Sequence, residues 1–226
     1  MIFIIYAISD IHGCYDEFIK MLQKIDFSKK DELYIIGDVI DRGNHPIKLL
    51  NYIRNQDNMT MIMGNHEKMM LDAISGPERN GIKRSGHNVN LWYRNGGSIT
   101  DHQFMKLNKE EQEEILLFLK NLPLGLEITV GQKNYILIHG GPTPNFVEEW
   151  NMRKLSEDVL WERIEHCSSE DIVYPGKIIV VGHTPTYLYG ATGIIKIGDK
   201  RLIDCGCVFG GGLGCICLDT EECFYI

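Results

Sequence analysis

Five apolar segments of this chain are each followed at once by a short polar motif that contains glycine. The segments with their motifs read IFIIYAI-SDIHG, YII-GDVIDRG, MIM-GNHE, ILI-HGG and IIVV-GHTP. A short apolar run bounded by glycine and polar residues is typical of a buried β-strand. In open α/β sheets, ligands bind outside the carboxyl ends of the strands. We therefore expect five motifs that are far apart along the chain to meet at one place.

The motifs supply six side chains that can bind a metal ion. They are Asp10, His12, Asp38, Asn65, His139 and His183. Any one of them alone has an ordinary explanation, because a single Asp after a strand usually caps a turn or helix. A single His after a strand is more often a satisfied buried residue than a ligand. Six such residues in corresponding places are hard to explain by turns, so the sequence predicts a metal centre.

The order of the expected elements favours an α/β fold in layers, with mixed sheets. The first half alternates strands at 2–8, 33–36 and 59–63 with helices at 15–25, 46–54 and 67–74. Asn108 is the expected N-cap of a helix at 109–120. Seven strands follow, at 126–130, 135–138, 178–181, 194–197, 202–204, 215–218 and 223–225. The chain has no low-complexity linker or repeat, so we expect a single domain over residues 1–226.

Residues 75–107 are polar and rich in glycine, with little periodicity. We interpret them as a long loop, and a loop of this length is more often functional than idle. The loop includes WYRNGG at residues 92–97.

Five of the seven cysteines fall in the last 22 residues. Their two C-x-C pairs could form a zinc site. However, residues i and i+2 of a strand share one face, and residues 203–219 read as two strands around a glycine turn. We therefore favour reduced, buried cysteines that act as small hydrophobic residues.

The charge and the N-terminus limit the expected partners. A net charge of −8 argues against a nucleic-acid surface, which needs a basic face. It also means that a phosphorylated ligand must be attracted by something local and positive, such as a metal site. The apolar N-terminus lacks the basic region of a signal peptide, and no apolar run is long enough to span a membrane. We expect a cytoplasmic protein without a membrane partner.

The motifs D-x-H-G at 10–13, G-D-x-x-D-R-G at 37–43, G-N-H-E at 64–67, His139 after a strand and G-H-T at 182–184 resemble those of the calcineurin-like metallophosphoesterases. The resemblance is strongest to the phosphoprotein phosphatase branch, because Pro185 stands where many other members have a second His. The absence of that His is typical of the phosphoprotein phosphatases and of their diadenosine tetraphosphatase relatives. The short chain is similar to the small bacterial and phage lambda-type serine/threonine protein phosphatases. The resemblance implies a two-sheet β-sandwich flanked by helices.

The resemblance also implies a role for each residue. Asp10 and His12 would bind one divalent ion, Asn65, His139 and His183 a second, and Asp38 would bridge the two. The ions would neutralise the phosphate and deprotonate a bridging water. Imidazole ligands disfavour Mg²⁺ and Ca²⁺, so we expect Mn²⁺, with Fe or Zn²⁺ as alternatives.

Four more residues complete the expected site. His66 is the candidate general acid, since free imidazole exchanges its proton near neutral pH. Asp41 would orient His66, and Arg42 would bind phosphate oxygens in a fork. Asn65 and His66 would also contact the phosphate. Arg163 resembles a second phosphate-binding arginine, although it could equally be a surface charge on a helix. We assign Glu67 a structural role at the start of a helix.

Three functions remain open on the sequence. The first is a protein phosphatase acting on phosphoserine and phosphothreonine, with phosphotyrosine as a further substrate. The second is a bis(5'-nucleosyl)-tetraphosphatase or a related nucleotide phosphohydrolase. The third is a degenerate phosphatase fold that serves as an interaction module, and the complete set of motifs counts against it.

Overall fold

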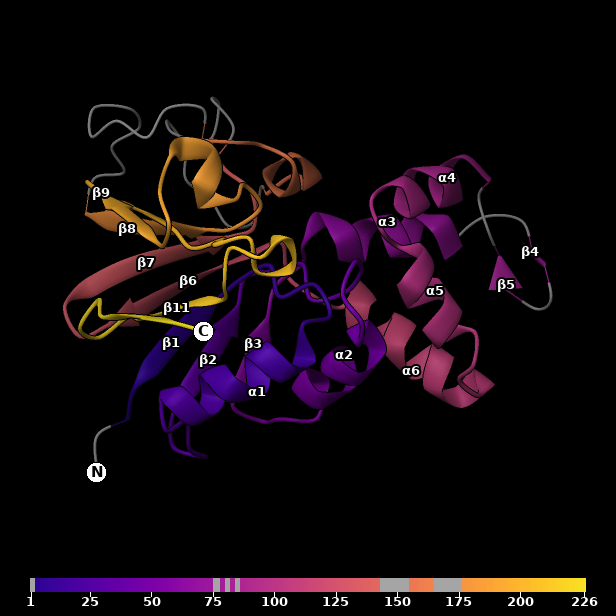
Figure 1. The fold of residues 1–226 in the computed structure, drawn as a ribbon, viewed down its shortest axis with the longest axis horizontal. Coiled ribbons are helices and arrows are strands. Elements are labelled where there is room, and N and C mark those ends of the chain that lie inside the picture. The colour runs from indigo at the N-terminus through magenta and orange to yellow at the C-terminus, as the bar shows by residue number, and fades with distance from the viewer. Residues whose placement is uncertain (1–2, 75–77, 80–81, 84–85, 143–154, 165–175) are drawn as a thin grey trace.

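Two five-stranded sheets lie face to face in the computed structural model (Figure 1). The structure describes residues 3–74, 78–79, 82–83, 86–142, 155–164 and 176–226. The first sheet has the order β12-β11-β1-β2-β3, with bounds Cys223–Tyr225, Gly214–Cys217, Ile5–Ile8, Glu32–Ile35 and Met59–Met61. The second has the order β6-β7-β8-β10-β9, with bounds Gly125–Val130, Lys133–Ile138, Lys177–Val181, Lys200–Leu202 and Ile195–Ile197.

Both sheets are mixed, as predicted. In the first sheet β1 pairs in parallel with β2 and β2 with β3, while β11 runs antiparallel to β1. In the second sheet β7, β8 and β10 are parallel to one another, and β6 and β9 are antiparallel edge strands. The carboxyl ends of β1, β2 and β3 therefore point the same way, as do those of β7 and β8.

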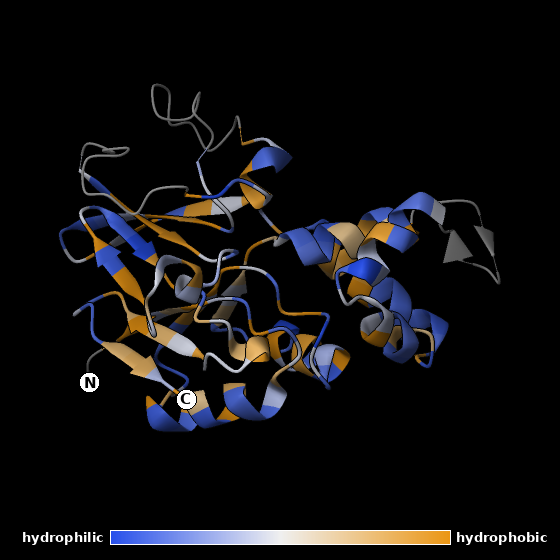
Figure 2. Ribbon diagram, turned by 45° about the horizontal axis from the view of Figure 1, so that its top comes forward, coloured by the Kyte–Doolittle hydropathy of each residue, from blue (hydrophilic) through white to orange (hydrophobic). Residues whose placement is uncertain are grey.

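The side chains of each strand alternate between two cores. Ile5 and Ala7 of β1 pack with Tyr135 and Leu137 of β7 in the core between the sheets. Their neighbours Tyr6 and Ile8 face the other way, into the core beneath the helices. This period of two is what a strand buried on both faces requires. Figure 2 shows hydrophobic residues gathered in several strands of both sheets, and hydrophilic residues over much of the helices and turns.

Among the residues that the structure describes, six α-helices accompany the sheets. They are α1 (Tyr15–Lys24), α2 (Pro46–Arg54), α3 (Asn65–Ile74), α4 (Gly86–Arg94), α5 (Ser98–Phe104) and α6 (Lys109–Lys120). Helices α1 and α2 lie beside the first sheet, whereas α3 to α6 form a separate helical layer at one end of the molecule (Figure 1). The predicted cap of α6 is confirmed, because Asn108 Oδ1 accepts from the Glu111 N–H and Glu111 Oε2 accepts from the Asn108 N–H.

The prediction of a loop over residues 75–107 is wrong in the part that the structure describes. Helices α4 and α5 occupy most of it, and two short strands, β4 (Glu78–Arg79) and β5 (Ile82–Lys83), form a separate pair. Helical periodicity is hidden because α4 buries one of its residues, Trp92, fully. In α5 two of the three buried residues are polar, Thr100 and Asp101.

The C-terminal cysteines lie where the chain leaves the second sheet and returns to the first. Cys205, Cys215 and Cys217 are buried and Cys207 and Cys223 are half-buried, all as free thiols. Among the described residues, the groups that could hold a metal ion contain no cysteine. The expected first strand of this region is wrong: β10 ends at Leu202, and Cys207–Phe209 form a 3₁₀ helix between left-handed glycines. In the described part of the chain, no helix is both long and apolar enough to cross a membrane.

Candidate metal centre

The six predicted ligands meet at the ends of strands from both sheets. Asp10 and His12 follow β1, Asp38 follows β2, and Asn65 opens α3 directly after β3. His139 follows β7 and His183 follows β8. Five of these side chains are buried, and His183 is partly exposed. The structure therefore brings together the residues that the sequence motifs singled out.

Asp38 lies at the centre of the group. Its Oδ1 is 3.3 Å from His139 Nε2, and its Oδ2 is 3.6 Å from His12 Nε2. Asp38 thus belongs to two groups of possible ligands, one with His139 and His183 and one with His12 and His66. Since its two oxygens face different groups, the carboxylate has the geometry of a bridge between two ions.

The histidine rings are held by the backbone. His12 Nδ1 lies 2.8 Å from the carbonyl oxygen of Ile40, and His139 Nδ1 lies 2.8 Å from that of Ile36. A carbonyl only accepts, so Nδ1 donates and each Nε2 faces the centre. This arrangement is usual for metal-binding histidines, whose second nitrogen is fixed by an acceptor outside the first shell of ligands.

Asn65 and Asp10 complete the group. Asn65 Oδ1 lies 2.9 Å from His139 Nε2 and 3.0 Å from His183 Nδ1. Asp10 Oδ2 accepts from the His183 N–H at 2.9 Å and contacts the Ser9 hydroxyl. Both residues thus contact His183, and the other oxygen of Asp10 lies 4.0 Å from His12 Nε2.

Strained backbone is concentrated at this site. Eight described residues other than glycine have a positive φ, and six of them are predicted site residues: Asp10, His12, Asp38, Asp41, Arg42 and His183. Such a conformation costs free energy for a residue with a Cβ and persists only where the surrounding structure enforces it. The chain therefore accepts strain to direct these side chains inward.

The electrostatics of the centre fit a positively charged ligand. Burial, and then the charge of Asp38, raises the pKa of Asp10 to about 6, with His139 opposing them. Burial would lower the pKa of His139, but Asp38, Asp10 and the Ile36 carbonyl together outweigh it and raise that pKa to about 10. Burial, and then His139, lowers the pKa of His183 to about 3. The buried carboxylates therefore favour a positive charge on His139, and divalent cations would supply positive charge at the same place. The donor set fits Mn²⁺, Fe or Zn²⁺.

His66 and Asp41 form a buried pair beside the centre. His66 Nδ1 donates to Asp41 Oδ2 at 2.6 Å, and His66 Nε2 lies 3.8 Å from Asp38 Oδ2. Because the first nitrogen is committed to Asp41, the second is directed at the candidate metal centre. This is the geometry expected of a proton donor to a group bound there.

Two arginines lie at the edge of the centre. Arg42 Nη1 contacts His12 Nε2, and the guanidinium lies 5.1 Å from the centroid of the exposed Phe209 ring. Arg163 is exposed and follows the 3₁₀ helix Glu157–Leu160 rather than lying on a helix. Its Nη1 donates to Thr184 Oγ1 at 3.0 Å, next to His183, so the structure places it at the site and not on a remote surface.

Glu67 holds two of the loops that carry the sequence motifs in place. Its side chain is fully buried in the first turn of α3. Oε2 accepts from the N–H groups of Asp38 and Gly64, and Oε1 from those of Val39 and Ile40. One carboxylate therefore ties the loop after β2 to the loop after β3.

Sequence reasoning missed several side chains at this site. Trp92 and Thr100 bind Asp41 directly. Asp204 is buried close enough to Asp10 that burial and then the Asp10 charge hold its pKa well above the ordinary value. The WYRNGG stretch, which has the pattern W-x-x-N-G-G, was the only sequence feature that pointed to Trp92. No sequence pattern pointed to Thr100 or Asp204.

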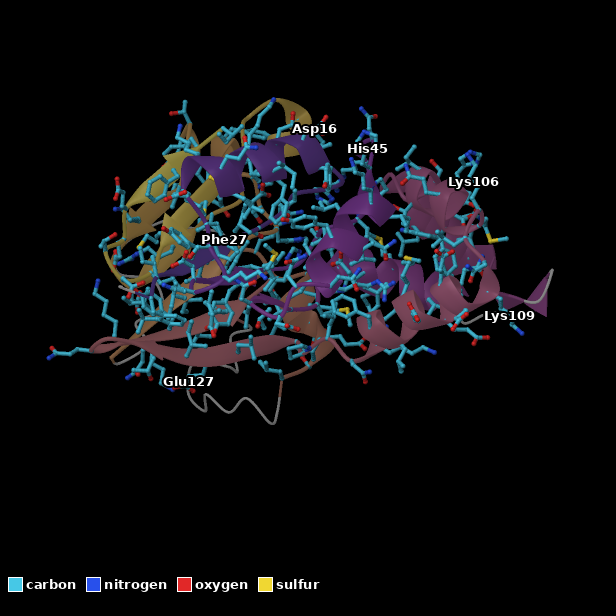
Figure 3. The ribbon with its side chains drawn as sticks, turned by 90° about the horizontal axis from the view of Figure 1, so that it is seen from below. Asp16, Phe27, His45, Lys106, Lys109 and Glu127 are labelled. Carbon is cyan, nitrogen blue, oxygen red and sulfur yellow. The ribbon has the colours of Figure 1, made fainter. Side chains whose placement is uncertain are left out.

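A cavity of 680 Å³ opens beside Arg42. Its lining includes Cys14, Asp16 and His45 as well as the 3₁₀ helix that carries Cys207. Figure 3 shows Asp16 and His45 close together along one edge of the molecule. The cavity gives a substrate larger than phosphate room next to the candidate centre.

Two packed sheets form this fold, and the ends of their strands bring acidic, amide and imidazole side chains together. This combination of fold and site is that of a metallophosphoesterase. The chain belongs to the calcineurin-like phosphoesterase family, whose sequence model matches residues 3–212. It is 28% identical over 213 residues to serine/threonine-protein phosphatase 1 of Salmonella typhimurium, which covers 92% of this chain and 89% of that protein. The chain is accordingly a hydrolase of the phosphatase type.

Two further similarities bear on substrate and fold. The symmetrical bis(5'-nucleosyl)-tetraphosphatase of Escherichia coli is 30% identical over 154 residues, covering 67% of this chain and 47% of that protein. A solved structure of a protein serine/threonine phosphatase from Saccharomyces cerevisiae has a TM-score of 0.65 at 14% identity, covering 99% of this chain and 79% of that one. At such low identity, this second similarity concerns the fold alone.

Proposed function

We propose that this chain is a dinuclear-metal-dependent phosphomonoesterase that acts as a serine/threonine protein phosphatase, with phosphotyrosine as a further substrate. The observation that carries the proposal is the position of Asp38, whose two oxygens face separate histidine groups. Two divalent ions in these groups would neutralise the phosphate and lower the pKa of a bound water. Manganese as the ion and the cytoplasm as the location stay predictions.

The chain's own residues have distinct tasks in this reaction. Arg42 and Arg163 flank the centre and bind phosphate oxygens through their planar forks. His66 donates a proton from Nε2 to the departing alkoxide oxygen, and Asp41 keeps Nδ1 occupied throughout. The cavity beside Arg42 accommodates the group that carries the phosphate.

The test of this function is Asp38→Asn, which keeps the shape of the side chain and removes the bridging charge. We expect purified Asp38→Asn to lose bound manganese, measured by elemental analysis, together with p-nitrophenyl phosphate hydrolysis. Asp57→Asn is the matched control, since Asp57 is exposed in the turn before β3. Normal hydrolysis by Asp38→Asn would rule out the bridging role. Wild-type protein that binds manganese but hydrolyses no phosphate ester would favour the interaction module.

A bis(5'-nucleosyl)-tetraphosphatase is the second candidate. The similarity to the E. coli enzyme of that name favours it, although this chain spans about half the length of that relative. The phosphatase from Salmonella matches over most of both chains, which favours the first candidate. Parallel assays on a phosphoserine peptide and on diadenosine tetraphosphate separate the two. We expect the higher kcat/KM on the peptide, and the opposite ratio would assign the chain to nucleotides.

A further inference from the structure

The W-x-x-N-G-G segment at residues 92–97 reaches the candidate catalytic pair from a distant part of the chain. Trp92 Nε1 donates to both oxygens of Asp41, at 3.0 and 2.9 Å. Thr100 Oγ1 donates to Asp41 Oδ1 at 2.6 Å and accepts from the Asp41 N–H at 2.9 Å. Together with His66, three side chains hold one carboxylate that is 0% exposed.

We propose that Trp92 and Thr100 are positioning residues for the reaction, acting through Asp41 on His66. The inference rests on the proposed function, because it assigns a purpose to their contacts in proton donation. Asp41 Oδ2 receives His66, and Oδ1 receives Thr100, so each oxygen has a partner that fixes the plane of the carboxylate. With that plane fixed, the His66 ring has one orientation, in which Nε2 points toward Asp38.

The same segment also holds the neighbouring arginine. The Arg42 N–H donates to the carbonyl oxygen of Gly96 at 3.1 Å. Gly96 has φ +96°, and a Cβ there would lie 2.7 Å from Arg42 Cγ, so glycine is needed for the approach. Helices α4 and α5 with their connection therefore support two consecutive site residues, Asp41 and Arg42, both of which have a positive φ.

Packing alone does not account for these contacts. A buried tryptophan needs an acceptor for its N–H, but a backbone carbonyl would serve as well. Here the indole N–H, a threonine hydroxyl and an imidazole all bind one ionised group, and hydrogen bonds to a charged group are the stronger ones. Removal of one donor leaves the carboxylate freer to turn, and His66 turns with it. Outer-shell partners of this kind commonly change activity by 10–100-fold when mutated.

The experiment compares two substrates that differ in their need for a proton. Phenyl phosphate releases a poor leaving group that depends on His66, whereas p-nitrophenyl phosphate releases a stable anion. For Trp92→Phe and Thr100→Val we expect kcat on phenyl phosphate to fall about 10–100-fold. We expect kcat on p-nitrophenyl phosphate to fall about threefold or less, with KM and manganese content unchanged. Thr100→Ser keeps the hydroxyl and should restore kcat. Thr60→Val, on an exposed position of β3, should have no effect.

A second readout does not depend on turnover. In zinc-loaded protein, which carries no paramagnetic Mn²⁺, the Nδ1 proton of His66 should appear far downfield in the proton spectrum, because it lies in a 2.6 Å hydrogen bond to a carboxylate. It is assigned by its loss in His66→Asn. We expect it to shift in Trp92→Phe and Thr100→Val and to return in Thr100→Ser.

The outcomes separate this inference from the proposed function. Equal losses on both substrates, or loss of manganese, would show a merely structural role and overturn the inference, as would an unmoved proton resonance. If Trp92→Phe does not fold, Thr100→Val and Thr100→Ser decide the matter by the same measurements. Wild-type protein that hydrolyses neither ester would refute the proposed function instead, and the proton resonance would still test whether Trp92 and Thr100 position His66.

Discussion

The contact between Trp92 and Asp41 can be tested by crowding it rather than deleting it. Gly97 lies against the indole of Trp92, and an added Cβ would lie 2.5 Å or less from Nε1, Cδ1 and Cε2. The backbone at Gly97 has φ −71°, which alanine adopts without strain. Gly97→Ala is therefore a purely steric change, and it must displace the ring.

The cost of this substitution has two parts. Overpacking a fully buried site costs about 1–3 kcal/mol. The indole must move by roughly 1 Å to reach ordinary contact, which weakens its hydrogen bonds to the Asp41 carboxylate, worth about 1.5–3 kcal/mol. The sum is about 2.5–6 kcal/mol. For a domain of this size, 1 kcal/mol changes Tm by about 2–4 °C, so we expect Tm to fall by roughly 5–24 °C.

The assay is thermal and urea unfolding of manganese-loaded protein, alongside Gly86→Ala. Gly86 opens α4, and a Cβ there would meet no heavy atom within 4 Å. Alanine is the better helix former, so this control should be as stable as wild type or slightly more stable. If Gly97→Ala unfolds within about 0.5 kcal/mol of wild type, the indole is not held as described and the reasoning on Asp41 fails with it.

Two further predictions concern catalysis and pH. His66→Asn should retain manganese and lower the rate on phenyl phosphate by roughly 10²–10⁴-fold, whereas loss of manganese would make His66 a ligand. The pKa of Glu221 lies below its ordinary value because hydrogen bonds from Lys133 and Arg201 outweigh the opposing effect of burial. A lowered folded pKa stabilises the protein above the unfolded value, so this contribution should be lost as the pH falls below about 4. In Glu221→Gln, the free energy of unfolding should therefore change less with pH in this range. An unaltered pH dependence would contradict the stabilising role of the Glu221 carboxylate.

Much of the fold could be predicted from local patterns. Apolar runs gave the strands that carry the motifs, and the capping residues of α6 marked its start correctly. The errors have two causes, which are the burial of polar groups by partners distant in sequence and glycines in the left-handed conformation. Helices α4 and α5 were interpreted as a loop because Thr100 and Asp101 are polar and yet buried. The chain after β10 was expected to be a strand, but left-handed glycines there make a 3₁₀ helix.

The sequence by itself determined the six candidate ligands and their convergence. Each stands within four residues of the end of an apolar strand, and parallel strands carry such positions to one edge of a sheet. The tertiary structure alone decided which side chains surround them. Trp92 and Thr100 reach Asp41 across 51 and 59 residues, and no local pattern encodes a contact of that separation. The physical reason is that the strand period fixes where a side chain points, whereas its partner depends on how the helical layer packs against the sheet ends.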